Sequence, residues 1–388
     1  MVYRIFYYLI KFTCYFYFKK VRIYNQENLN NKNPLIICAN HGNSFMDAIL
    51  IAINTKKKLH FLVRADVFNT PFKRWFFRQL NMMPIYRIRD GREAIKKNDN
   101  VFLKCRKILQ NNGAVVIFPE GNCVVEKRLR TFKTGFVHLA FNTPLQNLQV
   151  LPIAINYSQP DEFYTDASLH FLAPIALEDL KILTQNQEFD FNKILMQRTH
   201  DALKAQMVCI PYKTYDDFFE NVLKLKRNSM VLDDQSFITN QIETAESLHQ
   251  LGLKNPDLFE RIKSDVSNYF NHLNKTEIDD QTVASKPISV LKIGWLFPFY
   301  FSGYLLNIIP SNFLENMVNT KIKERQFKSS VRMVLSLFFY TIYILSVSYL
   351  LNFAFCNYLF SITITAGLLY IYYASFYSYN IFKQQQTP

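Results

Sequence analysis

The chain has 388 residues, of which 49% are hydrophobic and 20% charged, and its 45 Lys and Arg against 31 Asp and Glu give a formal net charge of +14. This composition excludes a disordered chain, a collagen and a disulfide scaffold. The six cysteines include no Cys-x-x-Cys pair, so we expect reduced thiols in a cytosol-facing protein. A basic body of this kind suits either a nucleic acid or an anionic membrane surface.

Residues 1–30 open with an apolar, aromatic stretch that basic residues interrupt, namely Arg4, Lys11, Lys19, Lys20 and Arg22. No small-residue cleavage site follows, so the stretch does not match a secretory signal peptide. Aromatic residues interspersed with Lys and Arg are typical of a helix that lies in a membrane interface. We predict an interfacial helix here, and an amphipathic helix packed on the rest of the protein is the alternative.

Residues 31–215 alternate apolar strands with helical stretches. The pattern predicts strands at 34–39, 59–63, 114–118 and 150–155, and helices at 44–54, 101–110 and 135–142. Alternation of this kind predicts an α/β domain. Residues 216–287 are polar, acidic and helical in pattern, which favours a solvated helical insertion.

The last region, residues 288–388, distinguishes between a nucleic acid and a membrane as the partner of this basic protein. No Asp, Glu, Lys or Arg occurs from Met333 to Phe382. A bilayer-spanning helix needs about 20 apolar residues, so we predict two transmembrane helices at about 333–355 and 359–380, which form a hairpin. A buried core hairpin is the alternative. The same uncharged run disfavours a basic RNA-binding protein, so we expect no nucleic-acid partner.

A weaker apolar run covers residues 293–309 and contains Pro298 and Gly303. Basic residues follow it, at Lys321, Lys323, Arg325, Lys328 and Arg332. Basic residues beside a membrane segment favour the cytoplasmic side. We therefore predict that residues 293–309 dip into the membrane and return, or lie on its surface. The protein would then be integral to the membrane, with residues 31–215 facing the cytoplasm.

The first of four motifs runs from Asn40 to Asp47, where a predicted strand ends and a helix begins. A carboxylate at Asp47 can accept a hydrogen bond from one imidazole nitrogen of His41, which leaves the other nitrogen as a base. The alternative is a histidine that serves only the cap of the helix.

The motif Phe118-Pro119-Glu120-Gly121 directly follows a predicted buried strand. It places a carboxylate and open backbone at the carboxyl end of a strand, where α/β sheets bind ligands. A plain turn is the alternative, because Pro and Gly are common in loops. The cations Lys127, Arg128, Arg130 and Lys133 follow, just before a predicted helix, and such an arrangement suits an anion.

The segment from Pro84 to Gly91 contains Arg87 and Arg89, which alternate with apolar residues. Both would project from one face of an extended segment, and a guanidinium suits a phosphate. Surface arginines in a loop are the alternative. The fourth motif, Val150 to Tyr157, is an apolar strand that carries Pro152, and by itself it indicates core.

These four motifs, in this order, resemble the PlsC-like glycerolipid acyltransferases over about residues 34–157. Asn40-His41 and Asp47 match the family's first motif, Arg87 the second, Phe118–Gly121 the third and Pro152 the fourth. Five residues separate His41 from Asp47, where the usual motif has four. That spacing resembles a branch with yeast-type glycerol-3-phosphate acyltransferases and bacterial relatives. A second departure is Asn122-Cys123, where many relatives have Ser, Thr or Arg.

The resemblance implies a mixed sheet flanked by helices and a direct acyl transfer. His41, held by Asp47, would take the proton from a glycerol hydroxyl, and the oxygen would attack the thioester of acyl-CoA or an acyl carrier protein. The phosphate end of the acceptor would be held by Arg87 with Glu120 and Gly121. Five residues would assist or support them: Arg89, Arg130, Lys133, Asn40 and Pro119, together with Pro152 in its strand.

The resemblance implies no metal and no cofactor, only the acyl donor as a substrate. The expected partners are membrane lipids and a phosphorylated glycerol acceptor, either glycerol-3-phosphate or its 1-acyl form. The alternatives are an acyltransferase for another lysolipid, a membrane-bound thioester hydrolase in which His41 activates water, and a lipid-binding scaffold with a dead site. Intact His41, Asp47 and Glu120 disfavour the scaffold. Cys123 has no paired histidine nearby in sequence, so we do not expect it to be a nucleophile.

Overall fold

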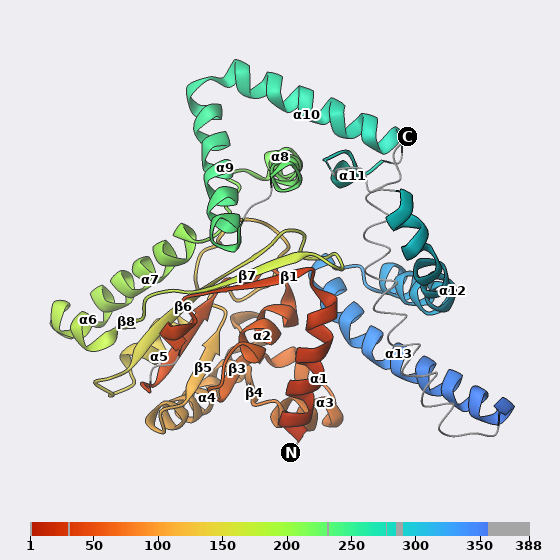
Figure 1. The fold of residues 1–388 in the computed structure, drawn as a ribbon. Coiled ribbons are helices and arrows are strands. Elements are labelled where there is room, and N and C mark those ends of the chain that lie inside the picture. The colour runs from red at the N-terminus through yellow and green to blue at the C-terminus, as the bar shows by residue number, and fades with distance from the viewer. Residues whose placement is uncertain (1, 30–31, 231–232, 277, 285–289, 356–388) are drawn as a thin grey trace. The chain divides into compact units, whose positions relative to one another are not determined.

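The computed structural model describes residues 2–29, 32–230, 233–276, 278–284 and 290–355 (Figure 1). The chain divides into two units, Met1–Cys209 and Ile210–Pro388. Unit 1 contains all the predicted strands. The described residues of unit 2 form helices and the loops between them, with no strand among them.

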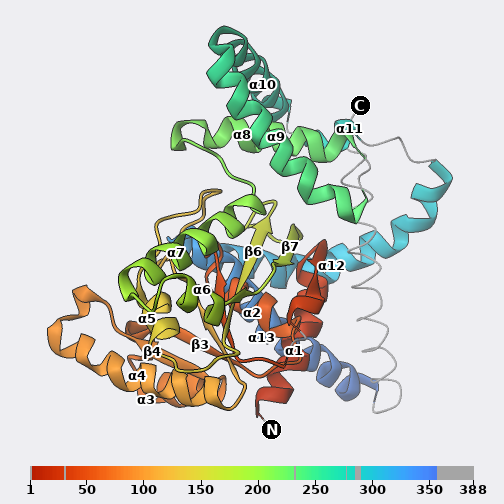
Figure 2. The ribbon, with the colours of Figure 1, turned by 90° about the vertical axis from the view of Figure 1, so that its left-hand side faces the viewer.

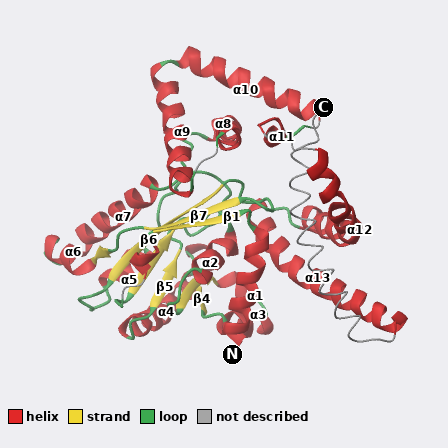
Figure 3. Ribbon diagram, viewed as in Figure 1, coloured by secondary structure: helices red, strands yellow, loops and turns green. Residues whose placement is uncertain are grey.

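Unit 1 is built on an eight-stranded mixed sheet with the order β1-β7-β6-β2-β5-β3-β4, in which β8 also pairs with β6 (Figure 3). The bounds are Lys20–Tyr24 (β1), Leu35–Ala39 (β2), Leu59–Arg64 (β3), Met82–Ile85 (β4), Ala114–Ile117 (β5), Gln149–Tyr157 (β6), Asp166–Phe171 (β7) and Ile175–Ala176 (β8). The strands β4, β3, β5, β2 and β6 run parallel to one another, whereas β7 and β8 are antiparallel to β6. The predicted α/β domain with a mixed sheet is therefore confirmed.

Seven helices surround the sheet in the described part of unit 1. They are Val2–Tyr17 (α1), Ser44–Ile53 (α2), Pro71–Gln79 (α3), Arg92–Gln110 (α4), Gly135–Phe141 (α5), Leu177–Leu183 (α6) and Glu188–Ala205 (α7). In Figure 2, α1 and α2 lie on the opposite side of the sheet from α5, α6 and α7. All five residues of β2 are buried, as expected for a central parallel strand covered on both faces.

The core on one face joins alternate residues of the central strands to α4, α5, α6 and α7. Ile36 and Cys38 of β2 lie in this cluster with Phe136 of α5 and Phe191 of α7. Successive side chains of a strand point to opposite faces, so Ile37, which is also fully buried, points to the face that carries α1 and α2. Both layers of helices hold β2 and its neighbours in place.

Two boundaries in unit 1 differ from the sequence predictions. The helix predicted at 101–110 begins already at Arg92, because the first half of α4 is polar and mostly exposed and gives no apolar period. The segment 1–30, assigned to one interfacial helix, contains both α1 and the strand β1. β1 pairs with β7 and is linked to it by the ion pair between Arg22 and Asp166 (2.6 Å). The sheet therefore begins at Lys20.

Unit 2 begins with the helices Asp216–Ser229 (α8), Asp234–Lys254 (α9), Pro256–Thr276 (α10) and Asp280–Ala284 (α11). The helical character predicted for residues 216–287 thus holds for the described part of that range. Aromatic rings of Phe218, Phe219 and Phe259 pack against one another and join α8 to α10.

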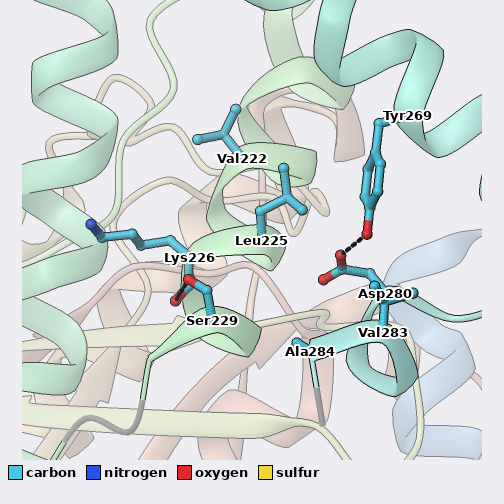
Figure 4. A pocket seen from close by; sticks show the side chains of 8 residues that line it. All are labelled: Val222, Leu225, Lys226, Ser229, Tyr269, Asp280, Val283 and Ala284. Carbon is cyan, nitrogen blue, oxygen red and sulfur yellow. Dashed lines mark hydrogen bonds between the residues drawn. The ribbon is translucent and has the colours of Figure 1, made fainter.

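A cavity of about 360 Å³ opens among α8, α10 and α11 (Figure 4). Its polar groups satisfy one another: the Tyr269 hydroxyl and the Asn228 amide each donate to Asp280 at 2.7 Å. The other lining residues are Val222, Leu225, Lys226, Ser229, Val283 and Ala284. The Asp280 carboxylate of this cavity therefore already accepts two hydrogen bonds from within unit 2.

The last two described helices are Val290–Lys321 (α12) and Arg325–Phe355 (α13), joined by a short connection at 322–324. They pack together through the ring contact of Phe313 with Phe339 and the ion pair of Arg332 with Glu315 (2.7 Å). Residues 293–309 lie inside the continuous helix α12, which is about 48 Å long at 1.5 Å per residue. Pro298 and Gly303 do not break the helix, so the predicted dip into the membrane and return is wrong, whereas a position on the membrane surface stays a prediction.

Among the described residues, Arg325–Leu350 of α13 is the one helix long and apolar enough to cross a membrane. It overlaps the first predicted transmembrane helix at 333–355. The second, at 359–380, lies outside the described residues.

Candidate active site

The carboxyl ends of five parallel strands meet at one edge of the sheet, where α/β proteins bind ligands. The motif residues are distributed along this edge. His41 follows β2, Glu120 follows β5, Arg87 follows β4, and Asp66 follows β3. Tyr157 ends β6. The fold therefore gathers residues that are up to 116 positions apart in the sequence.

His41 and Asp47 form a direct pair, with 2.9 Å between Nδ1 of the imidazole and Oδ2 of the carboxylate. The Asp47 side chain is completely buried, whereas 19% of the His41 side chain is exposed. Asp47 lies in the first turn of α2, and helical side chains point back toward the N-terminus, which brings the carboxylate to the loop that holds His41. The imidazole also stacks on the ring of Phe118, with 4.1 Å between centroids. Because Nδ1 is hydrogen-bonded to Asp47, Nε2 is the ring nitrogen that remains for contact with a substrate.

Asp47 accepts three hydrogen bonds. Besides the His41 ring, the Asn43 N–H donates to Oδ2 at 2.9 Å, and the Tyr157 hydroxyl donates to Oδ1 at 2.7 Å. Tyr157 is itself buried. Burial, with Asp47 beside it, raises the pKa of Tyr157 well above its ordinary value, so its hydroxyl stays protonated and donates. Both oxygens of the buried carboxylate are therefore fixed.

A second buried carboxylate, Glu120, holds the backbone of the same loop. Its Oε1 accepts the His41 N–H at 2.7 Å, and its Oε2 accepts Nε–H of Arg130 at 2.7 Å. Burial raises the pKa of Glu120, while Arg130 and the His41 N–H act in the opposite direction. Gly121 follows with φ +75°, a left-handed conformation that favours glycine, and an added Cβ would lie 3.3 Å from Lys133.

Cys123 lies beside the pair, and its Sγ accepts the Ser44 N–H at 2.9 Å. One ligand atom each from His41, Asp47 and Cys123 lies within 4.8 Å of the others. These are ligand types that zinc uses, so the three residues could hold such an ion after a small rearrangement. Burial, with Asp47 close by, raises the pKa of the Cys123 thiol. Since the thiolate is the nucleophilic form, Cys123 is a poor nucleophile here.

Arg87 follows β4 and is held by two carboxylates. Its Nη2 donates to Asp66 at 3.1 Å and lies 3.6 Å from Asp90, which also accepts the Arg87 N–H at 2.8 Å. The other guanidinium groups, Nε and Nη1, are buried and find no hydrogen-bond partner among the described residues. Buried donors in proteins nearly always have a hydrogen-bond partner. A ligand that accepts from Nε or Nη1 would supply the partner that the described residues do not.

Comparison with known proteins agrees with this geometry. An acyltransferase family model matches residues 20–156. The chain is 28% identical over 139 residues to a chloroplastic 1-acyl-sn-glycerol-3-phosphate acyltransferase of Arabidopsis thaliana, which covers 36% of this chain and 36% of that protein. It is 26% identical over 140 residues to a probable 1-acyl-sn-glycerol-3-phosphate acyltransferase of Mycoplasma pneumoniae, with coverages of 35% and 50%. The chain thus spans between about a third and a half of the curated relatives it matches.

The crystal structure of the 1-acyl-sn-glycerophosphate acyltransferase PlsC of Thermotoga maritima aligns with 48% of this chain and 71% of that chain, at 20% identity and a TM-score of 0.36. The segment that matches the family model contains His41, Asp47, Arg87 and Glu120. Residues 20–156 thus match the acyltransferase family, and this segment is called the acyltransferase domain below.

Not every predicted site residue lies where the sequence placed it within the acyltransferase domain. The strand β4 ends at Ile85, and Ile88–Asp90 form a short 3₁₀ helix. The prediction that Arg87 and Arg89 share one face of an extended segment is therefore wrong: Arg87 is mostly buried, and Arg89 is exposed. Lys133 is also exposed, and its N–H donates to the Pro119 carbonyl at 2.7 Å.

Glu120 and Arg130 of the acyltransferase domain are bound to each other. Arg130 Nη2 also donates to the carbonyls of Asn122 and, at 3.4 Å, His41. These contacts occupy both side chains and fix the loop that carries His41. A direct contact of either residue with substrate stays a prediction.

Asn40 and Pro152 support the site from the sheet. The Asn40 amide accepts the Ile155 N–H at 2.7 Å and donates to the Ile155 carbonyl at 2.9 Å. Pro152 lies opposite Cys38 in the pairing of β6 with β2, and its carbonyl accepts the Leu172 N–H at 3.0 Å. Together these contacts fix the position at which β2 ends, and therefore the position of His41 in the loop that follows.

Tyr157, one residue beyond the matched segment 20–156, is a site residue that sequence reasoning missed. It ends the fourth motif, which by itself indicates only core. A tyrosine at the carboxyl end of a predicted buried strand is the available signal, because a buried hydroxyl needs a partner. That the partner is Asp47, 110 positions away, depends on β6 lying beside β2.

We predict that Asn40→Ala lowers the free energy of unfolding by about 2–5 kcal/mol, since two buried backbone groups of Ile155 lose their partner and each costs about 1–3 kcal/mol. Denaturant unfolding of the purified protein in detergent measures this. The control is Asn147→Ala at an exposed position. A loss below about 1 kcal/mol would show that the Asn40 contacts do not hold the two strands.

We predict that Tyr157→Phe lowers kcat by about 10- to 100-fold, which corresponds to one hydrogen bond to a charged group at about 1.5–3 kcal/mol. KM for the acyl donor should change little, because Tyr157 contacts Asp47 rather than substrate. The exposed Tyr212→Phe is the matched control. Equal activity of the two variants would remove Tyr157 from the site.

Proposed function

We propose that this protein is a membrane-bound O-acyltransferase. It moves a fatty acyl group from acyl-CoA or an acyl carrier protein to a hydroxyl of glycerol-3-phosphate or 1-acylglycerol-3-phosphate. The observation that carries this proposal is the His41–Asp47 pair, a partly exposed imidazole held at 2.9 Å by a fully buried carboxylate. The two curated relatives, both named as 1-acyl-sn-glycerol-3-phosphate acyltransferases, support the class of acceptor.

His41 acts as the general base through Nε2. Nδ1 keeps its proton and donates it in a hydrogen bond to Asp47. Asp47 thereby fixes the tautomer of the imidazole and stabilises the imidazolium that forms. The acceptor oxygen loses its proton to Nε2 and attacks the thioester carbonyl. The new C–O bond forms, the C–S bond breaks, and the imidazolium returns the proton to the departing thiolate. No side chain becomes acylated, and the scheme requires neither a metal nor a cofactor.

Arg87 anchors the phosphate of the acceptor. Its buried Nε and Nη1 groups, which find no partner among the described residues, support this role, because either can donate a charge-assisted hydrogen bond to a phosphate oxygen. β4 lies three strand positions from β2, or about 14 Å at the spacing of neighbouring strands, so the acceptor lies along the sheet edge. Arg89 and Lys133, both exposed, add positive charge to that edge.

The membrane anchor is the helix Arg325–Leu350 of α13, together with the second predicted helix at 359–380. Its apolar length and the basic residues Lys321, Lys323 and Lys328 near its start support a cytoplasmic N-terminal end. The catalytic domain then faces the cytoplasm, where soluble acyl thioesters are present.

The general-base role predicts that His41→Ala lowers acyl transfer by about 100- to 10,000-fold while the protein still binds membranes. Asp47→Asn should cost less, because Asp47 orients the imidazole and does not transfer the proton. A labelled acyl thioester with glycerol-3-phosphate and 1-acylglycerol-3-phosphate as acceptors measures both variants. Activity of His41→Ala within about tenfold of the unaltered protein would contradict the mechanism. Release of free fatty acid without acylated acceptor would favour the hydrolase.

The phosphate role predicts that Arg87→Ala raises KM for a phosphorylated acceptor by about 10- to 100-fold, the equivalent of a charged hydrogen bond worth about 1.5–3 kcal/mol. KM for the acyl donor should stay close to its original value. The neighbouring Arg89→Ala is the matched control and should have a smaller effect, since Arg89 is exposed. If both substrates lose affinity equally, Arg87 does not bind the phosphate.

A further inference from the structure

His41, Asp47 and Cys123 bring three kinds of metal ligand to one point. One ligand atom from each lies within 4.8 Å of the others, and this is the one such group of three in the part of the chain that the structure describes. In a tetrahedral zinc site, neighbouring nitrogen, oxygen and sulfur ligands lie roughly 3.3–3.6 Å apart. Nδ1 of His41 already lies 2.9 Å from Oδ2 of Asp47. Shifts of about 1 Å would therefore complete three bonds to one ion.

The three ligands come from separate segments that are bonded to one another. His41 lies in the loop after β2, Asp47 in the first turn of α2, and Cys123 in the loop after β5. The Val124 N–H donates to the His41 carbonyl at 3.4 Å, which holds these two loops together. The Ser44 N–H donates to Sγ of Cys123 at 2.9 Å, a contact that suits a sulfur with negative charge. The fold thus places all three ligands before an ion binds.

The charges of this group suit a divalent cation. Asp47 supplies one negative charge and a thiolate at Cys123 supplies a second, so the two together balance an ion of charge +2. The thiol proton of Cys123 leaves to solvent, because a coordinating thiol is deprotonated by its metal. Arg130 lies nearby, but its charge is paired with Glu120 at 2.7 Å. Thiolate and imidazole ligands select zinc rather than magnesium.

We propose that Zn²⁺ binds to His41, Asp47 and Cys123 and thereby switches the site off. The ion takes Nδ1 of His41, the ring nitrogen beside Asp47, so the imidazole proton moves to Nε2. Nε2 then donates a hydrogen bond and cannot accept the proton of the acceptor hydroxyl. Binding of the ion stands on the geometry alone, whereas its inhibitory effect rests on the proposed function. Cys123 distinguishes this chain, because Asn122-Cys123 departs from the pattern of the motif.

Cobalt tests the binding without any turnover. Co²⁺ replaces Zn²⁺ in tetrahedral sites, and a thiolate ligand gives it a strong band from sulfur-to-cobalt charge transfer. The full-length protein in detergent is freed of metals with a chelator, kept reduced without added thiols, and titrated with Co²⁺. We expect the band to saturate at one equivalent of Co²⁺ and to disappear when Zn²⁺ is added.

The decisive variant is Cys123→Ser, which removes the sulfur and nearly keeps the size of the side chain. It should abolish the band. Cys209→Ser is the matched control, because Cys209 is also part-buried and lies outside the group. It should leave the band unchanged. His41→Ala should weaken Co²⁺ binding by at least about tenfold, since loss of even an outer-shell partner costs about 10- to 100-fold.

X-ray absorption at the zinc edge gives a reading that needs no variant. In the zinc-loaded, unaltered protein we expect one sulfur at about 2.3 Å and nitrogen or oxygen neighbours at about 2.0–2.2 Å.

Inhibition is measured for each protein as acyl transfer with Zn²⁺ relative to transfer by the same protein with chelator. Zn²⁺ should inhibit the unaltered protein and Cys209→Ser alike. Half-inhibition of Cys123→Ser should need at least about tenfold more Zn²⁺. Mg²⁺ at the same concentrations should not inhibit, because it avoids sulfur ligands.

A missing sulfur-to-cobalt band in the unaltered protein, or zinc without a sulfur neighbour, would overturn the proposal. The same holds if Cys123→Ser and Cys209→Ser respond alike. Equal inhibition by Mg²⁺ would also overturn it, because that result points to divalent cations bound to the phosphorylated substrate. A band that depends on Cys123 in a protein without acyl transfer would support the metal site and refute the proposed function.

Discussion

The buried carboxylate of Asp47 is the group on which the site depends. An uncompensated charge in the interior costs several kcal/mol, and this one is compensated by donors from two places in the chain. His41 and Asn43 come from the loop between β2 and α2, and Tyr157 comes from the end of β6. The loop must therefore adopt the one shape that delivers both donors, which includes the left-handed backbone of Ser44 (φ +45°). Such local strain persists only where the surroundings fix it.

The loop is held a second time through its backbone. Glu120 accepts the His41 N–H, so the carboxylate after β5 fixes the main chain, while Asp47 fixes the ring. Arg130 neutralises Glu120 from ten positions away. In the proposed mechanism, a base held in this way would lose little freedom when the substrate binds, which is the physical content of preorganisation. Both carboxylate oxygens of Glu120 are thereby bonded to groups of the protein. Arg87, at the same edge of the sheet, has buried N–H groups that find no partner among the described residues.

The parts that the sequence predicts are those set by local pattern. The strands β2 and β5 are unbroken apolar runs and β6 contains one from Val150 to Ile155, and the His41–Asp47 pair lies within one loop and the first helical turn that follows. β1 was missed because Lys20–Tyr24 alternates basic and apolar residues and resembles the end of a surface helix. The contacts of Tyr157 with Asp47 and of Arg87 with Asp66 depend on which strands become neighbours. No spacing along the chain encodes that order.

The inner face of α1 lies against the residues that hold Asp47. Phe18, just after α1, stacks on Tyr157 with 6.3 Å between the ring centroids, and Cys14 and Tyr17 are buried with it. Because α1 keeps water from Tyr157, the bond from its hydroxyl to Asp47 forms in a medium of low dielectric, where a hydrogen bond to a charge is stronger. The helix α1 and Phe18 therefore shield the Tyr157–Asp47 contact from water.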